Sequence, residues 1–447
     1  MNKPAGPANR GDTGVRYLVL AALCLAAIIA YIQRNSIGAF EISIREELSL
    51  RKERTGEIIS SFFWAYALFQ LPTGWLGHIW GSRRALPVCS AVCAAGAMLF
   101  TVAAGFPVLL VSRGIMGLSQ AGVFPCATGT IKSWMPVSQR AFASGLLTAF
   151  MQIGGAAGVA ATGWLVKQIG WRYTFALFAL PGFLWAIWFY FWFREFPRDH
   201  PSVNDGELEL LGNHSNEEGG LTSSGQLEPI PWRELLLNLP MAWFCAQQFF
   251  RAAGAVFYTS WFTTYLKSAR GVTDLAWAGV LTSFPLGAYA LGSFGGGWFS
   301  DWLLLRTGSR RISRKGLTMV SQLAFTVFLI IAYPVGNATL AVLIISVGAF
   351  CAAIGGPVAY AVAIDMGQNH VRPVFSLMNM WGNIGAFTFP LVVPYLVGKG
   401  TETNWDWALV VFGAIHVAAA LCWLGFDPGR PVLGNSNEEL DIDQAQR

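Results

Sequence analysis

Residues 17–39 have the sequence YLVLAALCLAAIIAYIQRNSIGA, an apolar run with a single charged residue, Arg34, close to its end. A helix of about 20 predominantly apolar residues is long enough to cross the hydrocarbon core of a bilayer. Of all residues in the chain, 54% are hydrophobic and only 12% are charged, whereas ordinary soluble domains carry about 25% charge. The sequence therefore predicts an integral membrane protein whose first spanning helix is this run.

Similar runs recur along the whole chain, which indicates an all-α membrane protein with twelve transmembrane helices. The predicted spans lie near 17–39, 57–77, 85–105, 107–131, 141–166, 172–193, 240–266, 276–304, 316–335, 338–364, 372–396 and 406–426.

A polar segment at 195–238 divides the twelve spans into six and six. Its composition cannot bury enough apolar area to fold alone, so we interpret it as a linker. The predicted organisation is an N-terminal tail, a six-helix bundle, the linker, a second six-helix bundle and a C-terminal tail. Their limits are 1–16, 17–194, 195–238, 239–426 and 427–447.

The two halves also resemble each other in sequence. Gly122–Pro125 has a counterpart in Gly355–Pro357, and Gln152–Gly155 has one in Asn383–Ala386. The matches are separated by about 220–235 residues, which fits two parallel six-helix repeats. In such pseudo-symmetric bundles the binding site is expected between the repeats near the bilayer midplane.

Lysine and arginine in the connecting segments predict the orientation, because cytoplasmic loops carry an excess of both. With a cytoplasmic N-terminus, eighteen lie on the cytoplasmic side and nine on the opposite side. We therefore expect both termini to be cytoplasmic. No basic patch with interleaved aromatic residues indicates nucleic-acid binding, and the seven cysteines show no spacing typical of a metal site.

Arg34 and Arg251 lie inside apolar spans, and no acidic residue lies near the middle of any span. An arginine at the bilayer centre costs about 2.5–3.5 kcal/mol on insertion scales, so it usually has a function there. An anionic ligand is the natural counter-charge, since the guanidinium fork donates two parallel hydrogen bonds to a carboxylate. The alternatives are hydrogen bonds to backbone carbonyls and, for Arg34, extension of the side chain to the membrane surface.

Several stretches resemble the major facilitator superfamily, and within it the anion:cation symporter branch. That branch includes bacterial sugar-acid transporters and the vesicular glutamate and sialic acid carriers. The stretches that carry the resemblance are Tyr31–Asn35, Ser61–Tyr66, Arg113–Leu118, Phe124-Pro125 and Asn379–Asn383. The resemblance covers essentially residues 17–426 and implies two pseudo-symmetric six-helix bundles that work by alternating access.

The resemblance also implies roles for individual residues. Arg34 would hold the substrate carboxylate, and Arg251 stands where the vesicular glutamate carriers have a second arginine. The other implied substrate-binding residues are Tyr31, Tyr66, Gln152, Asn379 and Asn383. Simple helix packing is the alternative for the tyrosines, for Gln152 and for Asn383.

Three positions depart from the pattern of the proton-coupled bacterial members. Gln33 replaces an aspartate before the first arginine, and Gln120 replaces a glutamate on the fourth helix. Glutamine cannot take up a proton near neutral pH, so the usual proton coupling is in doubt. His78 replaces an aspartate of the loop signature, whereas the second half keeps its aspartate. The predicted coupling or gating residues are Gln33, Arg113, Gln120, Asp301, Arg310 and Arg311, and for Arg113 a structural bond to a carbonyl or to Gln120 is the alternative.

The sequence thus predicts a secondary transporter of small organic anions, such as a sugar acid or another carboxylate, in a bacterial inner membrane. An organic phosphate:phosphate exchanger is the runner-up, because such exchangers also place one arginine on helix one and one on helix seven. A nutrient sensor built on a transporter fold is the remote alternative. We expect no enzymatic activity, cofactor, metal or nucleic acid, and a monomer whose coupling partner is a proton, sodium or an exchanged anion.

Overall fold

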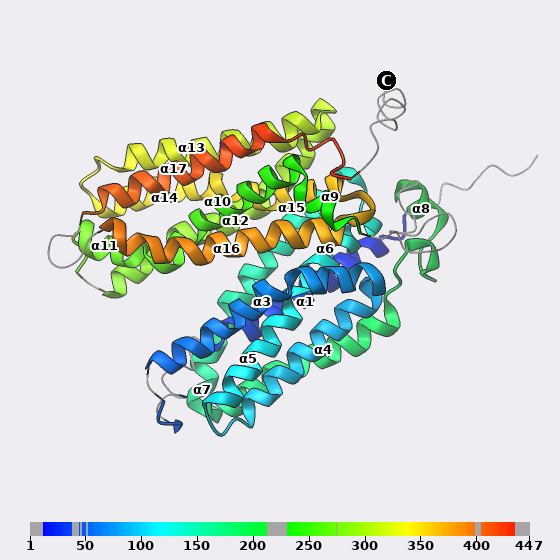
Figure 1. The fold of residues 1–447 in the computed structure, drawn as a ribbon, viewed down its shortest axis with the longest axis horizontal. Coiled ribbons are helices and arrows are strands. Elements are labelled where there is room, and N and C mark those ends of the chain that lie inside the picture. Colours follow the sequence, from blue (N-terminus) through cyan, green and yellow to red (C-terminus); the bar gives the residue numbers. More distant parts are fainter. Residues whose placement is uncertain are drawn as a thin grey trace, which may run out of the picture. The chain divides into compact units, whose positions relative to one another are not determined.

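The computed structural model describes residues 12–37, 44, 47–50, 52–211, 230–273, 275–397 and 404–433. The chain divides into two compact units, Met1–Glu228 and Pro229–Arg447. All regular structure in the described residues is helical. Each unit is a bundle of helices (Figure 1). Each has its own core of buried apolar side chains.

Unit 1 is built from long helices that correspond to the first six predicted spans. The longest, α7, covers the fifth and sixth spans together, and its backbone leaves the helical region at Gly170, where φ is 76°. The helices are α1 (Val15–Asn35), α3 (Lys52–Trp80), α4 (Ser82–Thr101), α5 (Phe106–Ala121), α6 (Val123–Trp134) and α7 (Arg140–Trp192), followed by the short α8 (Asp205–Leu211).

Unit 2 repeats this order of long helices. It begins with the short α9 (Trp232–Leu237), and the fourth span of each unit is interrupted, at Gly122 in unit 1 and at Ile354 in unit 2. The other helices are α10 (Leu239–Ser260), α11 (Phe262–Ala269), α12 (Leu275–Thr307), α13 (Leu317–Ala332), α14 (Ala338–Ala353), α15 (Gly355–Gly367), α16 (Val371–Val397) and α17 (Asp406–Cys422).

Equivalent helices pack together in the two units. In unit 1, α1 packs on α7 and α3 on α5; in unit 2, α10 packs on α16 and α12 on α14. Glycines make these contacts close. A Cβ at Gly154 would lie 2.7 Å from the carbonyl oxygen of Ile28, and one at Gly385 would lie 2.1 Å from that of Phe249. Small residues that let helix backbones approach are typical of packing within a membrane.

Large apolar side chains point outward from both bundles in helical stripes. One stripe, on the second part of α7, consists of Leu184, Ile187 and Phe191. Another stripe, on α13, includes Val320 and Val327. Eight helical stretches among the described residues are long and apolar enough to cross a membrane. Because an exposed apolar surface of this extent is unfavourable in water, these faces suit contact with lipid.

The ends of the predicted linker are helical and packed. α8 buries Glu207 and Leu211 in unit 1, and α9 buries Leu235 in unit 2. The composition of 195–238 does not reveal this order, because the burial depends on a few residues that contact the bundles. Residues 212–229 lie outside the described part of the chain.

Candidate functional site

Arg34 lies in the last turn of α1, where it is half-buried among aromatic rings. Its guanidinium carbon is 5.0–5.3 Å from the ring centroids of Tyr31, Phe62, Phe63 and Tyr66. Its only hydrogen bond to a described residue is a long one, from Nη1 to the hydroxyl of Tyr31 at 3.5 Å. Aromatic faces stabilise a cation without neutralising it. The cage therefore holds a positive charge, and within the described part of the chain the Tyr31 hydroxyl alone accepts from its N–H donors, which leaves the others available to an anion.

Arg113 on α5 supports the same end of α1 from behind. Its Nη1 and Nη2 both donate to the backbone carbonyl of Arg34 at 3.3 Å, and its guanidinium carbon lies 4.8 Å from the ring of Phe62. The side chain is almost completely buried. These contacts match the structural alternative for Arg113, a bond to a carbonyl, and they add a second positive charge close to Arg34.

Gln33 and Gln120 belong to one buried, neutral hydrogen-bond network. Gln33 donates to the carbonyl of Phe178 at 2.9 Å and accepts from the thiol of Cys93 at 3.0 Å. Gln120 donates to the carbonyl of Ala30 at 2.9 Å and to the Cys93 sulfur at 3.2 Å. The network joins α1, α4, α5 and α7 through groups that do not ionise near neutral pH.

Arg251, in the middle of α10, is held by polar but uncharged groups. Gln248 Oε1 accepts from its Nε at 3.0 Å and from its Nη2 at 2.8 Å, and the hydroxyl of Tyr289 on α12 accepts from Nη1 at 3.3 Å. A Cβ at Gly356 would lie 3.6 Å from Nη1, so the start of α15 passes close to the guanidinium. Among the described residues, no carboxylate forms an ion pair with Arg251 or with Arg34.

A polar bridge lies next to Arg251 in the core of unit 2. His416 Nδ1 is 2.6 Å from Gln322 Oε1, and Gln322 donates to the carbonyl of Ala352 at 3.1 Å, just before the break between α14 and α15. A Cβ at Gly355 would lie 3.0 Å from Gln322 Nε2 and 3.8 Å from Cδ of Arg251. The bridge therefore connects α13, α14 and α17. It lies beside Gly355, which is also close to the side chain of Arg251.

The remaining predicted binding residues lie on α7 and α16. Gln152 is exposed one turn before Gly155, where a Cβ would lie 2.5 Å from Asn35 Nδ2 and 3.7 Å from Tyr31 Cδ1. Asn383 donates to the carbonyl of Asn379 at 2.8 Å, one turn earlier on the same helix. Within unit 1 the structure brings Tyr31 and Tyr66 to Arg34, but no described contact joins Gln152 to that arginine.

Asp301, a predicted gating residue, forms a buried ion pair with Arg314 at 2.8 Å. Arg314 is fully buried and also donates to the hydroxyl of Ser300 at 2.7 Å. The equivalent position in unit 1 carries His78, which is buried as well. The loop signature therefore keeps its acidic residue in unit 2, whereas unit 1 has a histidine at that position.

The two other predicted gating arginines contact different carboxylates. Arg310 Nε lies 4.0 Å from Asp365 Oδ2 at the end of α15. Arg311 Nε donates to Asp427 Oδ2 at 2.8 Å, beyond the end of α17. Each of these arginines connects the start of the third helix of unit 2 to a later helix of the same unit.

Sequence reasoning missed several residues that shape these sites. Phe62 and Phe63 complete the aromatic cage, Cys93 links the two glutamines, and Gln248 holds Arg251. Three of them lie close in sequence to residues that the resemblance singled out. For Cys93 no signal was available, because an isolated cysteine in an apolar run is typical of simple packing.

These features define a membrane protein of two repeated helical bundles, each with an arginine inside an apolar helix that has no acidic partner among the described residues. The model of the Major Facilitator Superfamily matches residues 23–314 and 309–442. The chain therefore belongs to the Major Facilitator Superfamily, and it is a multi-pass integral membrane protein. The predicted all-helical fold of twelve membrane-spanning helices is confirmed.

Known relatives share nearly the whole length of the chain. A probable sulfoacetate transporter of Cupriavidus necator is 28% identical over 92% of this chain and 94% of its own length. A probable galactarate/D-glucarate transporter of Bacillus subtilis is 29% identical over 94% and 93%. A D-galactonate transporter of Escherichia coli is 26% identical over 94% and 97%.

Solved structures show the same fold. The outward conformation of a Major Facilitator Superfamily transporter, the fucose carrier FucP, superposes with a TM-score of 0.66 at 16% identity, covering 92% of this chain and 97% of that one. The proton:xylose symporter XylE superposes with a TM-score of 0.70 at 15% identity, covering 96% and 98%.

Proposed function

We propose that this protein is a secondary transporter that moves small organic anions across the membrane by alternating access. The observation that carries the proposal is the Arg34 cage, in which four aromatic rings surround a guanidinium that pairs with no carboxylate of the described residues. A carboxylate entering the cage would receive a charge-assisted pair of hydrogen bonds, which are about twice as strong as neutral ones. Tyr31 and Tyr66 would supply further contacts at the same place.

The number of free positive charges suggests a substrate with two anionic groups. Arg34 and Arg251, one in each unit, both lack an acidic partner among the described residues. Two of the relatives are named for sulfoacetate and for galactarate and D-glucarate, which are dianions, and one for D-galactonate, a monoanion. We therefore expect a sugar diacid or a similar dianion to be transported better than its monoanionic analogue.

The neutral network of Gln33, Cys93 and Gln120 argues against proton coupling at that place. Moving one negative charge into a negative-inside cell costs about 2.3 kcal/mol per 100 mV, and a dianion costs about twice as much. Uptake of a dianion therefore needs compensation, by exchange against another anion or by sodium, unless the protein works as an exporter. We expect uptake that does not depend on a pH gradient.

The remaining features of the proposal concern placement in the cell. The excess of lysine and arginine supports cytoplasmic termini, with the bundles at 17–194 and 239–426 joined by a cytoplasmic linker. The bacterial origin of the sulfoacetate, galactarate/D-glucarate and D-galactonate transporters named above supports an inner-membrane location. Gln152, Asn379 and Asn383 would contribute to the substrate site, and Asp301, Arg310 and Arg311 to gating.

Uptake by purified protein in liposomes tests the proposal. The panel contains sugar diacids, sugar monoacids, sulfoacetate and sugar phosphates, with membrane potential and pH gradient set independently. For the best substrate, Arg34→Ala should lower the uptake efficiency roughly 100-fold, because it removes a charged partner from a desolvated site. Arg54→Ala is the matched control, since Arg54 is exposed and its contacts with Glu57 and with the ring of Phe106 lie outside the cage.

The outcome also distinguishes the runner-up. Preferential transport of sugar phosphates would favour an organic phosphate exchanger over a carboxylate transporter. Arg251→Ala should reduce the preference for dianions over monoanions, because it removes one of the two free charges. Normal carboxylate uptake by Arg34→Ala in correctly inserted protein would contradict the proposed role of the cage.

A further inference from the structure

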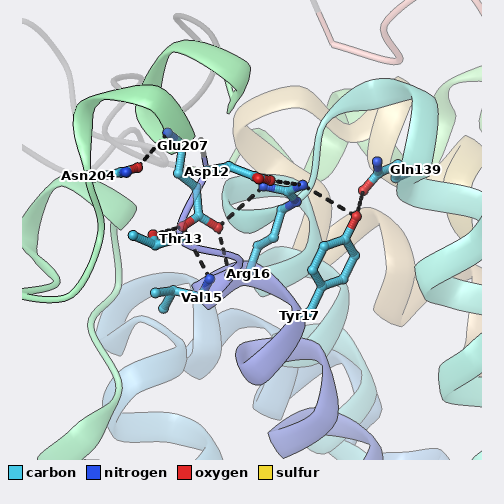
Figure 2. Close-up of polar contacts among 8 residues, drawn as sticks. All are labelled: Asp12, Thr13, Val15, Arg16, Tyr17, Gln139, Asn204 and Glu207. Carbon is cyan, nitrogen blue, oxygen red and sulfur yellow. Dashed lines mark hydrogen bonds and ion pairs between the residues drawn. The ribbon is translucent and has the colours of Figure 1, made fainter. Parts of the chain in front are cut away.

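Glu207, on the short helix α8 of the predicted linker, caps the first residues of α1. Its Oε2 accepts from the backbone N–H of Val15 at 3.1 Å and its Oε1 from that of Arg16 at 2.9 Å; the hydroxyl of Thr13 also donates to Oε2 (Figure 2). The N-cap position of α1 is Gly14, which offers no side chain for the purpose. A carboxylate at a helix start satisfies free N–H groups and interacts favourably with the helix dipole.

The charge of this carboxylate is balanced at the same place. Glu207 is fully buried, and Arg16 Nη1 lies 3.4 Å from its Oε1. Arg16 Nη2 lies 2.6 Å from Asp12 and donates to the hydroxyl of Tyr17, which in turn donates to Gln139 Oε1 at 3.4 Å (Figure 2). A buried charge is tolerated only when it is paired and hydrogen-bonded, as it is here. The cluster thus joins α8, α1 and the start of α7.

α8 is itself held against unit 1. Asn204 Oδ1 accepts from the backbone N–H of Glu207 at 2.9 Å and so caps α8. Leu211, one turn after Glu207, is buried on the same side of the helix. Upstream, His200 is buried with its ring edge-on to Trp134, at 5.7 Å between centroids. The segment from the end of α7 to Leu211 therefore belongs to the bundle.

A second helix of unit 1 is capped in the same manner. α4 begins after Gly81, which has a positive φ of 72° and no side chain to cap the helix. Glu195 Oε2, from the segment after α7, accepts from the backbone N–H of Arg83 at 2.8 Å. An N-cap glycine is therefore combined twice with a carboxylate that is distant in sequence. Gly14 and Glu207 are the pair with the larger separation along the chain.

Unit 2 makes the equivalent connection without charge. Asn238 caps α10 with its own Oδ1, which accepts from Met241 N at 3.0 Å, and its Nδ2 donates to the carbonyl of Val432 in the segment after α17. Val432 N donates to the carbonyl of Met366 at 2.9 Å. In each unit the segment after the last long helix thus returns to the start of the first.

We propose that Glu207 is a positioning residue for α1, and that α8 moves with the N-terminal bundle during transport. α1 carries Arg34 at its other end, so the cap helps to set the position of the helix that holds the candidate substrate arginine. Only the part of the linker after Leu211 then connects the moving bundles. The transport role rests on the proposed function, whereas the capping role does not.

Substitution of Glu207 by glutamine tests the cap sharply. The amide NH2 of glutamine would replace one carboxylate oxygen, and it would then face the two groups that donate to that oxygen. Since a donor cannot accept from another donor, a side chain of the same shape would lose these hydrogen bonds. In purified Glu207→Gln, hydrogen exchange at the amides of Val15 and Arg16 should accelerate roughly tenfold. In liposomes the maximal uptake rate should fall at least threefold while KM stays within twofold of wild type. Glu209→Gln, exposed on the same helix, should match wild type in both.

The two measurements separate the two parts of the proposal. Exchange at Val15 and Arg16 is measured without substrate, so unchanged exchange in Glu207→Gln overturns the cap whatever the protein transports. Faster exchange with a normal uptake rate overturns the transport role. If Glu207→Gln does not fold, Thr13→Ala removes one donor to the same carboxylate and should show a smaller acceleration; no acceleration there overturns the cap.

Discussion

In both bundles a carboxylate from the segment after the last long helix binds the start of the third long helix. The group that donates to this carboxylate differs between the two bundles. In unit 1, Glu195 accepts from the backbone N–H of Arg83 at 2.8 Å. In unit 2, Asp427 accepts from the side chain of Arg311 at 2.8 Å. Unit 1 thus uses the donors and dipole of the helix itself, whereas unit 2 uses ion pairs between side chains.

The loop signatures explain why the two solutions differ. Unit 2 keeps Asp301, whose pair with Arg314 is buried in the bundle. Unit 1 has His78 at that position, and Gly81 at the helix start leaves the space that Glu195 occupies. The same topological contact is thus stabilised through the backbone in one repeat and through charged side chains in the other. The two repeats should therefore respond differently to substitution.

The largest effect is expected for Asp301→Asn. Arg314 would remain fully buried without its carboxylate, and breaking a buried ion pair typically costs about 3–5 kcal/mol. The thermal midpoint of the detergent-solubilised protein should fall by roughly 10 °C. The measurement is the melting curve, followed by the fluorescence of a dye that reacts with the buried cysteines.

The double variant Asp301→Asn/Arg314→Met is the control for Asp301→Asn. It removes the stranded charge and should recover at least half of the loss, since replacing both partners of a buried pair is often nearly neutral. A single variant as stable as wild type would show that unit 2 does not depend on this ion pair.

A smaller effect is expected for Gly81→Ala in unit 1. The backbone there has φ 72° and ψ 165°, a region essentially restricted to glycine, where other residues cost about 1–3 kcal/mol. The new Cβ would also lie 2.8 Å from Glu195 Oε2 and displace the cap. The thermal midpoint should fall by several degrees, and the amide of Arg83 should exchange faster with solvent.

Gly316→Ala is the matched control, because Gly316 precedes the third long helix of unit 2. Its backbone is helical, with φ −60° and ψ −48°, and a Cβ there would meet only the carbonyl oxygen of Arg311 at 3.6 Å. Alanine is a better helix former than glycine, so the midpoint should stay the same or rise. Equal losses in both variants would remove the distinction between the two repeats.

The sequence predicts the helices well because a spanning helix must be long and apolar, and both properties are visible in one dimension. It also predicts that Arg34 and Arg251 lack acidic partners, since the spans contain none near their middles. The division of α7 agrees with the prediction of two spans, because the backbone leaves the helical region at Gly170, between the predicted fifth and sixth spans.

The contacts around the sites escape prediction for a different reason. Phe62 belongs to the cage only because α3 and α1 meet, and Glu207 caps a helix that begins 192 residues earlier. Glu207 also lies in a polar segment that composition assigns to a linker. A resemblance identifies shared motifs such as Ser61–Tyr66, but it predicts neither the contacts of every residue within them nor those of residues outside them, such as Glu207.

The smallest effect is expected for Asp427→Asn, and it should depend on pH. Burial alone raises the pKa of Asp427, but the hydrogen bonds from Arg311 and from the backbone N–H of Gly429 outweigh it and hold the pKa below its usual value. A carboxyl with a lowered pKa stabilises the folded state at pH values above its ordinary pKa of about 3.9, and this stabilisation is lost as the pH falls through the folded-state value. Arg311 is exposed, so the pair contributes no more than about 1 kcal/mol.

The difference in melting midpoint between wild type and Asp427→Asn should therefore be small but constant between pH 6 and 8, and should shrink below about pH 4. In an Arg311→Met background the difference should be smaller at every pH, because the main partner is gone. A difference that grows on acidification would mean that Asp427 is stabilised in its protonated form, and would remove the ion pair from the comparison of the two repeats.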